Sequence, residues 1–291
     1  MSALSPPQEI QIELYPGQYI AAQKWGHEGL PVLAIHGLLD NAGTFEALIP
    51  LLGSSVQICA IDLPGHGLSS HKPMGQYFHF TDVVIDLFRF ADLMGWKKFV
   101  LLGHSLGACI ASIMAGTFPE RVLGVALIDG LGPLTKTAKD SPTQLKRAID
   151  EHRLLSTKKL RQFSTIEEAV NARMHGAIEV NRTSAEILLK RGLKKTPLGW
   201  EWSTDPRLLL PTPSMMTEDQ VLYFLSEISS PTCLILPKDG YPFPVERMQP
   251  RMHRVKLLSV VEVPGEHHVH LEQPEAVAPY LNSFFDKLLL E

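Results

Sequence analysis

The sequence FVLLGHSLG, residues 99–107, decides the fold. An apolar run leads directly into a serine with glycines two positions before and after it, and the small-residue segment Leu106 to Phe118 reads as a helix packed closely on a sheet. A serine on such a tight strand-to-helix turn needs those glycines, because a Cβ there would collide with neighbouring backbone. The turn would expose the Ser105 hydroxyl and leave the Leu106 N–H facing a developing oxyanion. The bare pattern is also compatible with an ordinary glycine-rich turn.

Other apolar runs of strand length lie on both sides of this turn. Continuous runs predict strands buried on both faces, and alternation of polar and apolar residues predicts half-buried ones. The expected strands are Glu9 to Leu14, Gln18 to Trp25, Pro31 to Ile35, Val56 to Ile61, Phe99 to Leu102, Val122 to Ile128, Cys233 to Leu236 and Ser259 to Val263. Helical patterns at Thr81 to Met94, Leu106 to Phe118 and about 274–290 separate several of them. This alternation predicts an α/β fold with a mostly parallel central sheet and helices on both faces.

The pattern changes between residues 131 and 213, where no convincing strand is found. Thr165 with Glu168, and Thr183 with Glu186, read as capping boxes that begin helices, and Gly192 suits the end of the second helix. The simplest description is a core domain made of residues 1–130 and 214–291, interrupted by a helical insertion of residues 131–213.

A second glycine turn follows the run PVLAI, in the sequence HGLLDN of residues 36–41. Gly37 would let the backbone turn sharply, so that the N–H of Leu38 becomes a second oxyanion donor. The alternative is that this pair of residues only ends a strand. His36 itself is expected to be a hydrogen-bonded structural residue rather than a base.

Three histidines lie close together in the sequence VPGEHHVHLEQP, residues 263–274. His267 comes just past the last strand, in a loop at its carboxyl end, where parallel sheets place functional groups, and it is the expected general base. His268 and His270 are expected to be loop or capping residues. We expect no metal site, because no matching Cys, His or carboxylate cluster with ligand spacing stands elsewhere in the sequence.

The motifs HGLLDN, DLPGHGLSS, GHSLGA and GEHHVHLEQP occur in the order and context of the α/β-hydrolase superfamily, and the chain most resembles its serine-hydrolase-like group. The resemblance covers nearly the whole chain outside the insertion. It implies that Ser105 is the nucleophile, that His267 is the base, and that the insertion is a lid. Glu266 departs from the pattern, since relatives usually carry Gly there; it would stiffen the loop or bring a carboxylate near the base.

The acid that completes the triad is left open between two aspartates. Asp239 follows the strand CLIL, 28 residues before His267, a spacing similar to that of relatives, although the approach LPKDG looks shifted by one residue. Asp129 ends the strand VALID, 24 residues after Ser105, where some relatives place the acid. Asp239 is the first choice and Asp129 the second.

These residues predict cleavage of a carboxylic ester of a small or medium acyl compound through an acyl-enzyme. The same triad acting on a thioester, a lactone, a C–C bond or in peracid formation is the alternative, and a ligand-binding module with little turnover is the third. No cofactor is needed, and the oligomeric state stays open. Most of five large apolar residues in the insertion are expected to form its own core: Met174, Leu188, Leu189, Trp200 and Trp202.

Composition narrows the remaining classes. The 291 residues carry 27 Lys and Arg against 31 Asp and Glu, so nothing points to nucleic acid or an anionic membrane as a partner. Three distant cysteines make a disulfide framework improbable. With no leader-like segment and no apolar run long enough to span a membrane, we expect a cytoplasmic enzyme of a small-molecule substrate.

Overall fold

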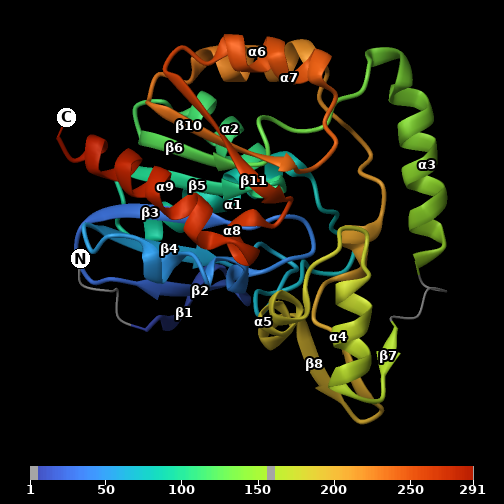
Figure 1. Cartoon of the computed structure of the whole chain (residues 1–291). Helices are drawn as coiled ribbons and strands as arrows, with labels where there is room; N and C mark the ends of the chain where they lie inside the picture. Colours follow the sequence, from blue (N-terminus) through green and yellow to red (C-terminus); the bar gives the residue numbers. More distant parts are fainter. Residues whose placement is uncertain (1–5, 156–160, 291) are drawn as a thin grey trace.

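A sheet of eight strands forms the centre of the computed structural model, which describes residues 6–155 and 161–290 (Figure 1). The strand order is β1-β2-β4-β3-β5-β6-β10-β11. The strands are β1 (Gln8–Tyr15), β2 (Gln18–Trp25), β3 (Leu30–Ile35), β4 (Val56–Ile61), β5 (Phe99–His104), β6 (Val122–Ile128), β10 (Thr232–Asp239) and β11 (Leu258–Glu266). β2 pairs antiparallel with both β1 and β4, and the pairings from β4 to β11 are parallel.

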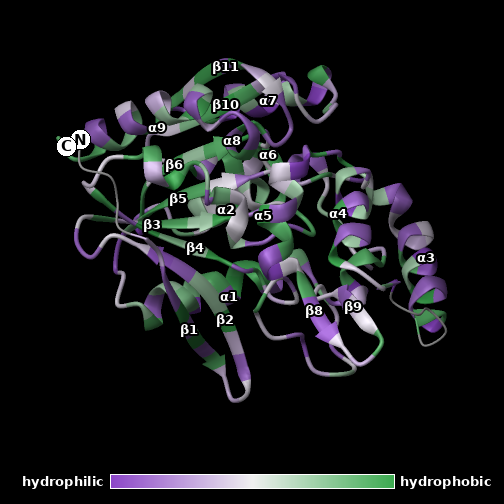
Figure 2. Cartoon of the chain, turned by 60° about the horizontal axis from the view of Figure 1, so that its bottom comes forward, coloured by the Kyte–Doolittle hydropathy of each residue, from purple (hydrophilic) through white to green (hydrophobic). Residues whose placement is uncertain are grey.

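Helices cover both faces of this sheet, and each face has its own hydrophobic core. One core holds side chains of α1 (Phe80–Leu93), α2 (Leu106–Thr117), α6 (Glu218–Glu227) and α7 (Val245–Arg254). The opposite core holds side chains of η1 (Ala42–Phe45), η2 (Ile49–Leu51), α8 (Val269–Glu272) and α9 (Pro274–Leu288). Figure 2 shows the hydrophobic colour along the central strands. The mostly parallel sheet between helices predicted from the apolar runs is confirmed, and it is the α/β-hydrolase fold.

The chain between β6 and α6, which includes the predicted insertion of residues 131–213, contains helices and short strands. Its elements are η3 (Ala138–Asp140), α3 (Ser141–Arg153), β7 (Gln162–Phe163), α4 (Ile166–Met174), α5 (Arg182–Gly192), β8 (Leu193–Thr196), β9 (Gly199–Trp202) and η5 (Pro206–Leu209). The expectation that this stretch lacks strands was wrong, because β7, β9 and β8 form a small antiparallel sheet. These strands have four residues at most, too short to leave a periodic pattern in the sequence.

One of the two predicted helix starts is confirmed and the other was wrong. The hydroxyl of Thr165 accepts the N–H of Glu168 at the start of α4, whereas the Glu168 side chain accepts the N–H of Ser164 and so does not complete the capping box. α5 instead begins after Asn181, whose side chain accepts the N–H of Ser184. Asparagine is as good an N-cap as threonine, and here it comes first in the chain.

A small hydrophobic cluster lies inside the insertion. It contains Phe163, Ala169, Val170, Val180, Ala185 and Leu189, against which Met174, Trp200 and Trp202 also pack. Leu188 is buried outside this cluster, and its carbonyl accepts a hydrogen bond from the Asn41 side chain. Four of the five large apolar residues singled out in the sequence therefore belong to this local core.

A buried arginine, Arg191, joins the insertion to the core of the protein. The guanidinium of Arg191, at the end of α5, lies 2.8 Å from the Asp62 carboxylate behind β4 and 2.6 Å from Glu9 of β1. Such ion pairs are held only where their geometry compensates the loss of hydration. The insertion is thus fixed against the core by charge pairs as well as by its two chain connections.

No helix in the described ranges, 6–155 and 161–290, is both long and apolar enough to cross a bilayer.

Candidate active site

Ser105 stands on a strained turn between β5 and α2. Its φ of 52° and ψ of −116° lie where a residue with a side chain is rarely found. A Cβ on Gly103 would come within 2.5 Å of the Gly107 carbonyl oxygen, and one on Gly107 within 1.9 Å of the Ile35 carbonyl oxygen. Both glycines are therefore required for the turn to form and for α2 to approach β3. The Ser105 side chain is half-buried at the carboxyl end of the parallel strands.

The turn after β3 lies beside this serine. The N–H of Asp40 donates to the carbonyl of Gly37 at 3.2 Å, and Leu39 between them has a φ of 65°. Within the described chain, the backbone N–H groups of Leu38 and Leu106 have no hydrogen-bond acceptor. Two free N–H groups near one hydroxyl are what an oxyanion site requires.

His36 plays the structural part that the sequence predicts for it. The N–H of Leu63 donates to its Nε2 at 3.0 Å, and its Nδ1 donates to the Gly37 carbonyl oxygen at 2.6 Å. Burial lowers the pKa of His36 to about 4, so the ring is neutral at pH 7. A neutral ring with both nitrogens engaged holds the turn and cannot act as a base.

His267 follows the end of β11, and a carboxylate lies against its Nδ1. Oδ2 of Asp129 is 2.6 Å from that nitrogen and also accepts the backbone N–H of Tyr241 at 2.7 Å. Both side chains are nearly closed to solvent. Because a carboxylate only accepts, Nδ1 carries the proton of the neutral ring and Nε2 keeps its lone pair. This arrangement suits a base whose orientation is fixed by its partner.

Of the two candidate aspartates, the structure places Asp129 against His267 and Asp239 away from it. Asp239 lies exposed at the end of β10 and has no hydrogen bond to His267 in the described part of the chain. A Cβ on Gly240 would come within 2.6 Å of Oδ2 of Asp129. The loop after β10 thus presents backbone to the site, and the carboxylate arrives from β6 instead. Glu266 is exposed and forms no ion pair with His267 among the described residues.

His104, the residue before the serine, contacts His267. Nε2 of His104 donates to the carbonyl oxygen of His267 at 2.9 Å, and their ring centroids are 4.6 Å apart. The Ser105 hydroxyl forms no hydrogen bond with the imidazole of His267 among the described residues. Catalytic hydrogen bonds are often long before substrate binds, so the lack of this bond does not exclude His267 as the base.

Backbone strain is concentrated at this one edge of the sheet. Across residues 6–155 and 161–290, the non-glycine residues with a positive φ are Leu39, Ser105 and Asp129. They end or follow three neighbouring strands, β3, β5 and β6. Such strain costs free energy and persists only where the surrounding structure holds it. Strained residues are for this reason found mostly at functional sites.

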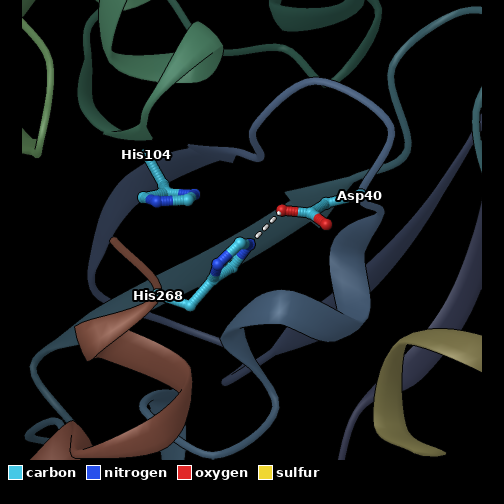
Figure 3. Close-up of side chains that lie close together, drawn as sticks. All are labelled: Asp40, His104 and His268. Carbon is cyan, nitrogen blue, oxygen red and sulfur yellow. Dashed lines mark hydrogen bonds and ion pairs between the residues drawn. The ribbon is translucent and has the colours of Figure 1, made fainter. Parts of the chain in front are cut away.

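Figure 3 shows a buried cluster of three side chains that the sequence did not reveal. Asp40, His104 and His268 point toward one another, and their ligand-type atoms lie within 4.8 Å. The sequence offers no cluster with ligand spacing to match these histidines, and folding brings Asp40 to His268 from 228 residues away. Nε2 of His270 and the hydroxyl of Thr44 form a hydrogen bond of 2.8 Å. Sequence spacing carries no signal for contacts of this range.

A cavity lies away from these residues. It has a volume of about 650 Å³ and is lined mainly by β1, β2 and the end of α5, including Glu9, Trp25 and Arg191. None of the residues predicted for the site lines it. This cavity is therefore not part of the candidate site, whose chemistry depends on the positions of its own side chains.

Comparison with known proteins identifies the family of the chain. A family model described as the alpha/beta hydrolase fold matches residues 31–151. A serine hydrolase-like protein of Danio rerio is 34% identical over 280 residues, which cover 92% of this chain and 86% of the relative. A probable serine hydrolase of Drosophila melanogaster is 34% identical over 284 residues, with coverage of 92% and 85%.

Solved structures agree with these sequence relatives. The crystal structure of a hypothetical protein of Pseudomonas aeruginosa PAO1 is 37% identical, with a TM-score of 0.90 over 96% of this chain and 99% of that one. A thioesterase domain from the curacin biosynthetic pathway is 24% identical, covers 97% of this chain and 99% of its own, and has a TM-score of 0.83, so it shares the fold. Matched along most of its length by serine hydrolase-like relatives, this chain belongs to the serine-hydrolase-like group of the α/β-hydrolase superfamily.

Proposed function

We propose that the protein hydrolyses a carboxylic ester of a small or medium acyl compound, with Ser105 as nucleophile, His267 as base and Asp129 as the acid. The pairing of His267 with Asp129 at 2.6 Å, beside a serine on a strained turn, is the observation that carries this proposal. A nucleophile, a base and a group that orients the base are the recurring parts of a serine hydrolase.

The reaction follows from these placements. His267 takes the Ser105 proton on Nε2 while the serine oxygen attacks the carbonyl carbon, and the N–H groups of Leu38 and Leu106 bind the oxyanion. The imidazolium then gives its proton to the leaving alcohol, and an acyl-enzyme remains. Water, deprotonated by His267, attacks the acyl group and restores the serine. Asp129 stays ionised and stabilises the charged ring.

The preference for an apolar acyl group is supported by the surface next to the serine. Leu38 and Leu39 expose 51% and 38% of their area on the turn beside Ser105. Exposed leucines beside a reactive polar group are typical of a site that binds an apolar chain. We assign the insertion as the lid of this site, since α4 and α5 contact the segment that follows that turn.

Labelling with a fluorophosphonate probe and mapping the modified peptide by mass spectrometry tests the proposal. The wild type should be labelled on Ser105 and hydrolyse short 4-nitrophenyl esters, and Ser105→Ala should lose both. Asp129→Asn should lower kcat about 10⁴-fold, as loss of the acid does in other triads, because the ring loses its tautomer control. Asp239→Asn is the matched control and should leave kcat within about twofold.

Two results would contradict the proposal. A Ser105→Ala variant that hydrolyses the esters at the wild-type rate would remove the nucleophile. A larger loss in Asp239→Asn than in Asp129→Asn would reassign the acid. Activity confined to thioesters or lactones across a panel of matched acyl groups would keep the triad and replace the ester.

A further inference from the structure

A buried ion pair joins the insertion to the turn beside Ser105. Nη2 of Arg173, near the end of α4, lies 2.9 Å from Oδ1 of Asp40, and Nη1 donates to the carbonyl oxygen of Ile178 at 3.0 Å. The side chains of the pair are only 16% and 4% exposed. Both charges have lost most of their hydration, so each is stabilised by the other. Removal of either residue leaves the other as an uncompensated buried charge.

The carboxylate of Asp40 is also bound by the histidine that follows the proposed base. Oδ2 of Asp40 accepts from Nε2 of His268 at 3.0 Å, the contact drawn in Figure 3. Burial alone would raise the pKa of Asp40, but the charge and hydrogen bond of His268 and the charge of Arg173 hold that pKa well below its usual range. Asp40 is therefore an anion at any pH at which a serine hydrolase works.

This anion and the side chain of the nucleophile both lie next to Gly37. A Cβ built on Gly37 would lie 3.3 Å from Oδ2 of Asp40 and 3.2 Å from Cβ of Ser105. One point thus contacts both side chains. Asp40 also closes the turn that carries the Leu38 N–H, through the hydrogen bond of its own N–H to Gly37.

The cluster has the donor types of a metal site, yet the protein supplies the cation itself. Asp40, His104 and His268 offer a carboxylate and two imidazoles within 4.8 Å. Nη2 of Arg173 approaches both Asp40 and His268, at 2.9 and 3.4 Å. A guanidinium is always charged and therefore occupies the place of a metal ion at every working pH.

We propose that Arg173 is a positioning residue for the hydrolysis, which neutralises the buried Asp40 carboxylate so that a negative oxyanion can form beside it. The inference rests on the proposed function. Without the guanidinium, the buried carboxylate loses one of the two partners that compensate its charge, and the uncompensated part of that charge repels the oxyanion that develops in the transition state. The substrate is uncharged at that atom before the reaction, so the repulsion slows the chemistry without weakening binding. Docking of α4 against the core is in this way required for turnover.

Steady-state kinetics on a short 4-nitrophenyl ester test the assignment. Arg173→Gln should lower kcat by about 10-fold to 100-fold, with KM changed less than threefold, because only the charged transition state is affected. Arg173→Lys should recover most of the loss, since it restores the charge. The double variant Asp40→Asn/Arg173→Gln should recover kcat to within about tenfold of the wild type, because no buried anion remains to repel the oxyanion.

Arg182→Gln is the matched control. Arg182 belongs to the same insertion and pairs with Glu167 of α4, but both side chains are about half exposed, so its loss should leave kcat within about twofold. The proposal is overturned if Arg173→Gln keeps the wild-type kcat, if its loss appears in KM alone, or if the second substitution at Asp40 gives no recovery.

Folding and function are kept apart in this test. If Arg173→Gln does not fold, the double variant is measured in its place, because it leaves no unpaired buried charge. A double variant that folds and is more than about tenfold slower than the wild type overturns the proposal. Fluorophosphonate labelling of the wild type comes first. An unlabelled Ser105 would contradict the proposed function, whereas a labelled Ser105 with an unaffected Arg173→Gln variant contradicts this inference alone.

Discussion

Asp129 has very little room beside Gly240. Any Cβ at residue 240 would sit 2.6 Å from Oδ2 of Asp129. We expect Gly240→Ala to push the carboxylate away from His267 and to lower kcat about 100-fold, since displacement of a catalytic group by about 1 Å costs this much. The measurement is kcat on a 4-nitrophenyl ester, together with the urea midpoint of the variant.

Gly53→Ala is the control for that substitution. The nearest atom to a Cβ on Gly53 is 3.7 Å away, an ordinary contact. It should leave kcat within about twofold. Wild-type kcat in Gly240→Ala would mean that Asp129 tolerates displacement and has no orienting role.

At the scale of single residues, the sequence predicted the groups that local rules constrain. Ser105 could be found because its turn needs glycines at fixed positions, and His267 because it follows a strand into a loop. Asp129 ranked second because the 28-residue spacing to His267 favoured Asp239, and no motif encodes the positive φ of 50° at Asp129. Asp40 and Arg173 were not recognised at all, because their contact spans 133 residues.

Among the elements, α7 fixes the start of the insertion through one buried side chain. The guanidinium of Arg251 donates to the carbonyl oxygens of Leu131, Gly132 and Pro133, and pairs with Glu218 of α6. We expect Arg251→Leu to lower the free energy of unfolding by about 3–5 kcal/mol, because several buried acceptors lose their donor. Urea denaturation followed by circular dichroism measures this.

Arg254→Leu controls for the loss of an arginine from the same helix. Arg254 is exposed three residues further along α7, and its replacement should change the free energy of unfolding by less than about 0.5 kcal/mol. Equal effects of the two substitutions would show that α7 responds to charge and not to the contacts of Arg251.

The elements of the core were predictable because burial on both faces leaves long apolar runs, as in β3, β4 and β6. β8 and β9 were missed for the opposite reason. They are half-exposed, carry lysines and tryptophans, and turn at Gly199, where a φ of 123° excludes other residues. Short strands on the surface of an insertion depend on their partners and leave little periodicity.

For the whole molecule, buried neutral histidines make stability depend on pH. Burial lowers the pKa of His66 to about 3, and that of His36, 4.9 Å away between ring centroids, to about 4. The unfolded chain binds a proton at each near pH 6.5, so their contribution is complete above that pH and is lost as the pH falls toward the folded values. Unfolding should become easier by about 2 kcal/mol per histidine between pH 7 and pH 5.

Urea denaturation of His66→Asn at both pH values checks this. Its loss of stability between pH 7 and pH 5 should be smaller than that of the wild type by about 2 kcal/mol, because one proton-binding group of the unfolded chain is gone. His27→Asn removes an exposed histidine and should leave the difference unchanged. An unchanged difference in His66→Asn would mean that this ring titrates alike in both states.

The positive φ angles of Leu39, Ser105 and Asp129 affect how a more thermostable variant of this enzyme could be obtained. Glycine at any of the three would relieve torsional energy of about 1 kcal/mol or more. Heat resistance would therefore be gained most readily at the positions where turnover would be lost. A screen for thermostability alone would enrich inactive variants. Each round of such a screen therefore needs a parallel selection for substrate cleavage.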